Sequence, residues 1–138
     1  MSVPARHRRP HGSVLIEFVI VLPVFLLLLL ASIDWGWYFV LRETAVNATR
    51  EGARAGSVAP AGLAADDAAL AVQTYLTNSL GPRHVHAETI QVTPTTVRGH
   101  QAISVSLVNY PAGSITGFTP TQVPTTLTAT TVMRLESP

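Results

Sequence analysis

The chain has 138 residues, which is enough for one small domain with an anchor but too few for two independent cores. Charged residues make up 12% of it and the formal net charge is +1, which excludes a general polyanion binder, so we expect no nucleic-acid partner. Cysteine is absent, which excludes disulfides, thiol nucleophiles and zinc–thiolate sites.

The first twelve residues form a basic leader. They contain Arg6, Arg8 and Arg9, two prolines and no acidic residue. Such a segment cannot bury a core, so we expect it to be disordered. Because cations next to an apolar run stay in the cytoplasm, the sequence predicts a cytoplasmic N-terminus with the remainder of the chain outside.

Residues 14–33 form an apolar run in which Glu17 is the one charged residue. As a helix, this run would span about 30 Å at ~1.5 Å per residue, the thickness of a bilayer's hydrocarbon core. It is also longer than the apolar part of a typical cleaved secretory signal. The run therefore predicts a transmembrane helix, in which Pro23 removes one backbone hydrogen bond and favours a mild kink.

Aromatic residues follow the apolar run directly. Trp35, Trp37 and Tyr38 are of the type that concentrates at membrane–water interfaces, and we expect them to anchor the helix at the outer boundary. Apolar and polar residues continue at helical spacing, with no proline before Gly56. The pattern therefore predicts one helix over residues 13–55.

The rest of the chain has the pattern of a small mixed domain. Residues 56–62 are a predicted linker and 63–80 a second helix, with Ala65, Ala69, Val72 and Leu76 on one stripe and Gly81-Pro82 as its stop signal. Alternating residues around Ile90 and Ile103, joined at Arg98-Gly99, predict a β-hairpin, and residues 125–135 predict a third strand.

These elements define an α+β fold class: a long N-terminal transmembrane helix that continues outside the membrane, then a short helix and a small antiparallel β-sheet. The corresponding division of the chain is a leader over 1–12, the long helix over 13–56 and an extracytoplasmic domain over 57–138.

No enzyme motif is present: the sequence lacks a G-x-S-x-G elbow, a phosphate-binding P-loop and an H-E-x-x-H pair. His84 and His86 would share a strand face, and His100 could approach them across the hairpin to complete a three-histidine metal site. We interpret them instead as exposed imidazoles. We expect no catalytic activity, no cofactor and no bound metal.

Glu17 needs an explanation, because an ionisable residue inside a bilayer costs about 2.5–3.5 kcal/mol at the helix centre. One reading is that its carboxylate reaches the nearby cytoplasmic surface. The other is that it pairs with a cation on another subunit. The surrounding residues 12–18, Gly-Ser-Val-Leu-Ile-Glu-Phe, resemble a type IV prepilin processing site, where a prepilin peptidase cuts after glycine. The resemblance implies a cut between Gly12 and Ser13, with Glu17 as the fifth mature residue.

The resemblance extends along residues 12–56, in the order Glu17-Phe18, Leu22-Pro23, Asp34 and the block Arg50-Glu51-Gly52-Ala53-Arg54. This order resembles the TadE-like family, the pseudopilins of tight-adherence (Tad/Flp) pilus systems. Ser13 departs from the methylated aromatic residue that begins many mature type IV pilins. Residues 57–138 match no motif.

The resemblance implies roles for these residues. Glu17, followed by Phe18, would set helix registry, because its carboxylate meets the N-terminal amine of a neighbouring subunit at one axial offset. Pro23 and the block Arg50-Glu51-Gly52-Ala53-Arg54 would take part in helix packing. Gly52 and Ala53 permit close approach, either to the domain over residues 57–138, called the outer domain below, or to a partner subunit, and the flanking charges limit which neighbours fit.

The sequence is thus interpreted as a minor pseudopilin or pilus-assembly component in the bacterial inner membrane, and its incorporation in an extracellular pilus is left open. The implied partners are other pilins or pseudopilins, a prepilin peptidase, a pilus assembly platform and the lipid bilayer. One alternative is an uncleaved single-pass scaffold of a secretion or envelope complex. Another is a periplasmic enzyme or ligand-binding domain released by signal peptidase after Ala31.

Overall fold

A computed structural model describes residues 11–60, 62–117 and 123–136, so most of the leader and its expected disorder lie outside the described residues. The elements in chain order are α1 (His11–Val58), α2 (Ala64–Leu80), the short 3-10 helices η1 (Pro82–His84) and η2 (Ala87–Thr89), and the strands β1 (Ile90–Val97), β2 (His100–Pro111) and β3 (Thr126–Arg134). The α+β fold class is confirmed.

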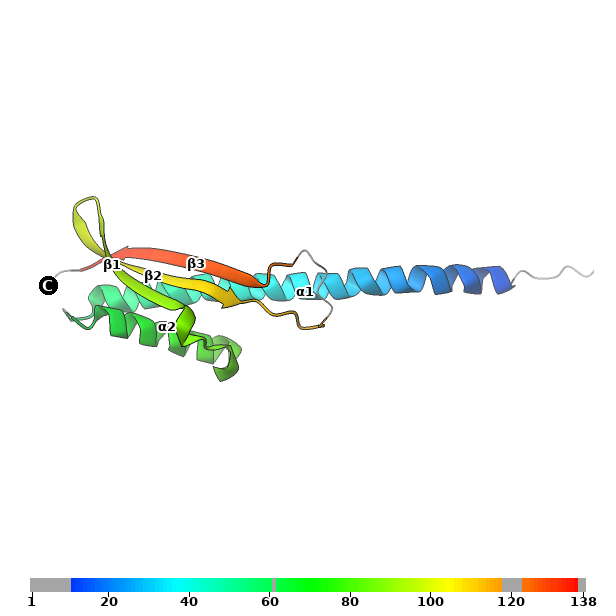
Figure 1. Ribbon diagram of the computed structural model, residues 1–138, viewed down its shortest axis with the longest axis horizontal. Coiled ribbons are helices and arrows are strands. Elements are labelled where there is room, and N and C mark those ends of the chain that lie inside the picture. Colours follow the sequence, from blue (N-terminus) through cyan, green and yellow to red (C-terminus); the bar gives the residue numbers. More distant parts are fainter. Residues whose placement is uncertain (1–10, 61, 118–122, 137–138) are drawn as a thin grey trace, which may run out of the picture.

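The helix α1 is one continuous helix of 48 residues, about 70 Å long at ~1.5 Å per residue. Its apolar first half projects alone from the molecule, while its second half is covered by α2 and the sheet (Figure 1). It ends three residues later than predicted, so Gly56–Val58, which we expected in a linker, is helical. The reason is tertiary: Gly56 is buried where α2 and β2 approach α1.

The three strands form one antiparallel sheet in the order β1-β2-β3. The turn between β1 and β2 is Arg98-Gly99, and both residues have positive φ, 51° and 79°. A two-residue turn of this kind matches the right-handed twist of the strands it connects. The predicted hairpin is confirmed, as is the third strand.

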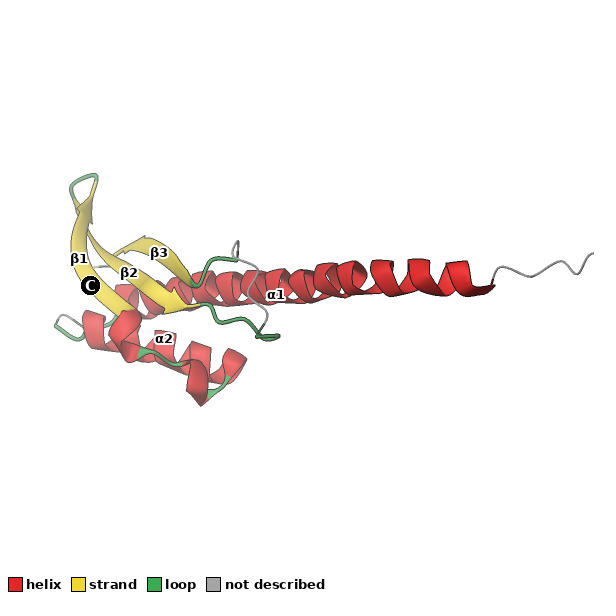
Figure 2. Ribbon diagram, turned by 45° about the vertical axis from the view of Figure 1, so that its right-hand side comes forward, coloured by secondary structure: helices red, strands yellow, loops and turns green. Residues whose placement is uncertain are grey.

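One face of the sheet packs on the second half of α1 and on α2, and the core lies between them (Figure 2). On α2 the buried residues are Ala68, Val72 and Leu76, so the predicted stripe is wrong at Ala65, which is exposed. The larger buried set comes from α1, β2 and β3: Leu41, Ala45, Ala48, Ala53, Ile103, Val105, Leu107, Leu127 and Ala129. The core is therefore built from both sides of the domain boundary that we placed at residue 56.

A β-bulge brings Tyr110 into this core. Leu107 pairs with Ala129, but Tyr110 pairs with Leu127, so β2 contains one extra residue in this interval. Asn109 takes up the irregularity with a φ of 54°. Strict alternation from Leu107 would turn Tyr110 outward, and the extra residue turns it inward. Its side chain is fully buried, and its hydroxyl donates a 2.6 Å hydrogen bond to the His84 carbonyl.

Candidate functional site

The sequence-derived processing and registry residues lie at the start of α1. The backbone of Gly12 and Ser13 belongs to the first turn of the helix. Glu17 is exposed, and so are its apolar neighbours Val14 and Phe18, at 67% and 59% of their surface. Among the described residues, none forms a hydrogen bond or an ion pair with the Glu17 carboxylate. Within the described part of the chain, the fold itself therefore does not use this carboxylate.

The helix around Glu17 is long and apolar enough to cross a membrane, and it is the one such helix within the described ranges. Pro23 lies inside α1, and the helix continues on both sides of it. The side chains over residues 14–29 are all exposed, which leaves the surface of this segment available to lipid or to neighbouring helices.

The three expected interface anchors do not share one environment. Trp35 is 37% exposed and lies beside Phe39, with ring centroids 5.9 Å apart. Trp37 and Tyr38 are instead partly buried against the core, and the Trp37 ring lies 6.1 Å from that of His84. Trp35 thus lies outside the set that packs on the core, whereas Trp37 and Tyr38 also help to hold the outer domain on α1.

Asp34 connects the end of the apolar run to the loop after β2. Its side chain is only 1% exposed. One oxygen, Oδ2, accepts hydrogen bonds from the hydroxyls of Ser114 and Thr116, at 2.8 and 2.6 Å. The other, Oδ1, accepts from the backbone N–H groups of Ile115 and Thr116, both at 3.1 Å. Four donors from one short segment therefore converge on a single carboxylate.

These donors favour the charged form of the acid. The Thr116 hydroxyl is the main cause that holds the pKa of Asp34 below its ordinary value, while burial acts in the opposite direction. Sequence reasoning missed this role. The available signal was a lone acid directly after the apolar run. Its partner Ser114 lies 80 positions further along the chain, where no local pattern points to it.

We expect Asp34→Ala to release the loop over residues 112–117 while α1 stays intact. Hydrogen exchange at the amides of Ile115 and Thr116 should accelerate by roughly tenfold or more, because both lose their acceptor. Glu43→Gln, which changes an exposed acid on the same helix, should leave these rates unchanged. Unaltered exchange in Asp34→Ala would show that the carboxylate does not hold the loop.

The same bonds predict a pH dependence. Because the folded-state pKa of Asp34 is lowered, its contribution to loop attachment is complete above the ordinary carboxyl pKa of 3.8 and is lost as the pH falls below it. Asp34→Asn cannot titrate, so the exchange rates of this variant should lack that acid transition. A transition that persists in Asp34→Asn would assign it to another group.

The block over residues 50–54 is divided between two environments. Gly52 and Ala53 are buried, and a Cβ placed on Gly52 would lie 2.5 Å from Val72 Cγ2 on α2. Arg50 and Arg54 are exposed. The small residues of the block therefore contact the protein's own outer domain, whereas the side chains of Arg50 and Arg54 remain exposed.

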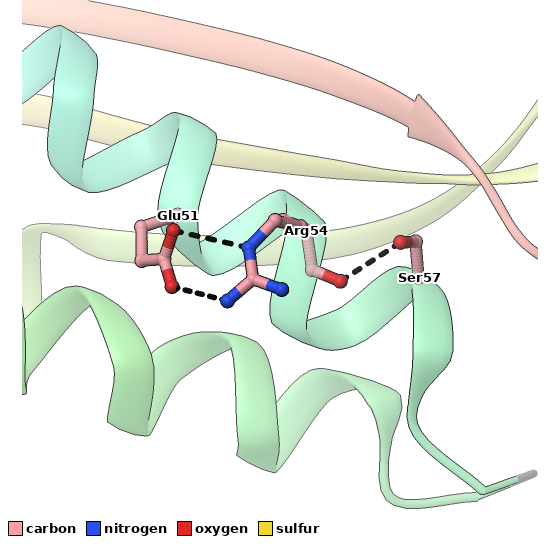
Figure 3. A network of polar contacts seen from close by, with 3 residues as sticks. All are labelled: Glu51, Arg54 and Ser57. Carbon is pink, nitrogen blue, oxygen red and sulfur yellow. Dashed lines mark hydrogen bonds and ion pairs between the residues drawn. The ribbon is translucent and has the colours of Figure 1, made fainter.

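Glu51 and Arg54 form a two-point ion pair on the surface of α1, close to α2 (Figure 3). Arg54 Nη2 lies 2.6 Å from Oε1 of Glu51, and Nε donates to Oε2 at 3.2 Å. The hydrogen bond from Arg54 lowers the pKa of Glu51, and the same bond raises the pKa of Arg54. Because both side chains are exposed and solvent screens their attraction, the pair matters more for the surface it presents than for stability.

That surface is the edge of an open groove of about 840 Å³ between α1 and α2. Its lining includes the charged pair together with Val58 and Leu70, which are 59% and 63% exposed. Ser57 Oγ donates to the Arg54 carbonyl at 2.8 Å within the last turns of α1 (Figure 3).

A second polar contact that the sequence did not reveal joins α1 to β3. The Thr49 hydroxyl is fully buried and lies 2.9 Å from the Thr131 hydroxyl. It also donates to the Val46 carbonyl. A buried hydroxyl without partners would be costly, so this pairing specifies which turn of α1 the strand can cover.

The three histidines considered as a metal site are separated by the length of β1. His84 and His86 precede that strand, whereas His100 begins β2 on the far side of the hairpin turn. Over residues 11–60, 62–117 and 123–136, no three His, Cys, Asp or Glu side chains are placed to share a metal ion.

Comparison with known families adds to this geometry. Residues 12–54 match the model of the family described as TadE-like protein, which confirms the resemblance. No curated protein and no solved structure matches the chain. The match covers 43 of the 138 residues, all of them in α1, and residues 55–138 lie outside it. With the apolar half of α1, the match indicates a single-pass membrane protein.

Proposed function

Because residues 12–54 are TadE-like, we propose that this protein is a minor pseudopilin or assembly component of a Tad-type pilus, processed by a prepilin peptidase between Gly12 and Ser13. One observation carries the proposal. Glu17, the single acid of the apolar run, is exposed on the first half of α1, where residues 14–29 are all exposed, and it is the fifth residue after the proposed cut.

The proposed mechanism is lateral helix packing. The bare half of α1 can exchange lipid neighbours for helix neighbours at little cost, because lipid tails are as apolar as the side chains that replace them. Processing would create a free amine on Ser13, and Glu17 of an adjacent subunit would pair with it. The Ser13 amine and the Glu17 carboxylate each have a fixed position along their own helix. They can therefore meet at only one axial offset between the two subunits.

The proposed location is the bacterial inner membrane, with the N-terminus in the cytoplasm and the outer domain outside. Arg6, Arg8 and Arg9 support this orientation, because they precede the apolar run and cations of this kind remain cytoplasmic. The assembly platform would then meet the cytoplasmic and membrane parts, while α2 and the sheet are presented outside to other pilins.

The intact mass and N-terminal sequence of the purified protein test the proposal. We expect the mature chain to begin at Ser13 in cells that contain a prepilin peptidase and at the native start in cells that lack it. Gly12→Leu should block the cut, since the peptidase must accommodate a small residue there, whereas Gly36→Leu should be processed normally.

The other results have distinct meanings. An unprocessed chain in the presence of an active peptidase would favour the uncleaved membrane scaffold. A new N-terminus near Ser32 would indicate release by signal peptidase. Removal of twelve residues from Gly12→Leu would contradict recognition of this site by a prepilin peptidase.

A further inference from the structure

The loop that follows β2 lies at the point where α1 leaves its apolar run (Figure 1). The contact is direct, because the Ile115 N–H is bonded to Asp34 Oδ1 at 3.1 Å and Asp34 is the residue after Ile33. The apolar run over residues 14–33 is about 30 Å long as a helix and fills the hydrocarbon core, so its last residue marks the outer boundary of that core. The backbone of Ile115 therefore lies at the level of this boundary.

The side chain of Ile115 is not used by the fold. It is 59% exposed, although the backbone N–H of the same residue is held by Asp34. Trp35, 37% exposed, follows Asp34 on α1 and belongs to the type that occupies the lipid interface. An exposed aliphatic side chain at this level has lipid, rather than bulk water, as its nearest solvent.

The polar groups of the loop are compatible with contact with lipid. The segment over residues 112–117 contains no charged residue. The Ser114 hydroxyl donates to Asp34 and accepts from the Gly117 N–H at 3.0 Å, and both donors of Thr116 are bonded to the same carboxylate. Because unsatisfied polar groups are costly next to hydrocarbon, these bonds lower the cost of bringing the loop close to lipid.

We propose that Ile115 inserts into the lipid surface, so that the outer domain has a second membrane contact beside α1. The inference rests on the membrane anchorage in the proposed function. Asp34 is the connecting group, since its carboxylate joins the helix and the loop. A helix alone leaves the domain free to tilt and rotate, whereas two contacts determine which face of α2 and the sheet is presented to neighbouring subunits.

The absence of cysteine makes the test direct, because a single introduced cysteine carries a spin label at a known site. Three full-length variants are reconstituted at one copy per phosphatidylcholine nanodisc: Ile115→Cys, Leu26→Cys within the apolar run, and Val97→Cys. Val97 is the matched control, an aliphatic residue 44% exposed at the far end of the hairpin. Label collision rates are measured with oxygen, which enters lipid, and with a water-soluble nickel chelate.

We expect the oxygen-to-nickel collision ratio to be highest at position 26, severalfold lower but still lipid-like at 115, and lowest at 97. A ratio at 115 equal to that at 97, with 26 in hydrocarbon, would overturn the lipid contact and leave the anchorage intact. A water-like ratio at 26 would overturn both. Because each disc holds one copy, a neighbouring subunit cannot shield position 115.

Adding Asp34→Ala to Ile115→Cys tests the connecting role. The ratio at 115 should fall towards that at 97 when the loop is released, while the ratio at 26 in the matching double variant stays unchanged. Retention of the lipid-like ratio at 115 would show that Asp34 does not place this loop on the membrane.

Discussion

Gly52→Val should lower the thermal midpoint of the outer domain by roughly 10–20 °C, whereas Gly36→Val should leave it nearly unchanged. Any side chain at position 52 would place its Cβ 2.5 Å from Val72 Cγ2 and 2.9 Å from the Ala68 carbonyl oxygen. The oxygen belongs to the backbone of α2, so the clash can be relieved only by moving that helix. A Cβ at position 36 would meet nothing within 4 Å.

The size of the effect follows from two opposing contributions. Overpacking a tight contact lowers the free energy of unfolding by about 1–3 kcal/mol. A branched side chain pressed against backbone atoms should cause a loss near the upper end of this range. Replacing glycine inside a helix returns only a few tenths of a kcal/mol, because valine is itself a modest helix former. In a domain of this size each 1 kcal/mol corresponds to about 4–8 °C.

The measurement is thermal unfolding of the full chain in detergent, followed by near-ultraviolet circular dichroism, which reports side-chain packing. Gly56→Val should behave like Gly52→Val, because a Cβ there would lie 2.7 Å from the Ala64 carbonyl oxygen. Equal midpoints for the variants at 36 and 52 would contradict the close approach of α1 and α2.

Glu17→Ala should separate membrane insertion from assembly. Insertion should be unchanged or improved, because the variant avoids a desolvation cost of about 2.5–3.5 kcal/mol. Removing one member of a buried ion pair costs about 3–5 kcal/mol, so co-purification with partner pilins should fall by roughly 100-fold or more. The readouts are membrane fractionation for insertion and quantitative co-purification for assembly.

Two conservative variants distinguish pairing from simple polarity. Glu17→Gln keeps the shape and loses the charge, so it should resemble Glu17→Ala in assembly. Glu17→Asp keeps the charge but shortens the reach by one methylene, so it should retain partial assembly. If Glu17 only reaches the cytoplasmic surface, all three variants should bind partners as the wild type does, and the pairing proposal would fail.

The local patterns of the sequence determined most of the architecture. The length of the apolar run, the absence of proline between Pro23 and Pro60, and the turn residues Arg98-Gly99 each act over a few neighbouring positions. Helical spacing, strand alternation and turn conformation depend on such short-range terms. The long helix, the second helix and the three strands could therefore be assigned without any knowledge of tertiary contacts.

The ends of these elements were less certain, because packing decides them. Gly56 reads as a helix terminator, since glycine weakens a helix by roughly 0.5–1 kcal/mol relative to alanine. In the folded chain the lack of a side chain is what allows α2 and β2 to approach α1 at that position. The helix therefore continues through the glycine and ends at Val58.

The assignment of partners was decided by the tertiary structure alone. Asp34 and Ser114 are 80 residues apart, and no periodicity relates them. The inward position of Tyr110 depends on one extra residue in β2, which reverses the alternation that the sequence displays. Burial of a polar group requires specific donors in place, and these come from whichever segment the folded chain brings near. Short-range pattern therefore determined the elements, and the satisfaction of buried polar groups determined how the loop after β2 is held at the end of the apolar run.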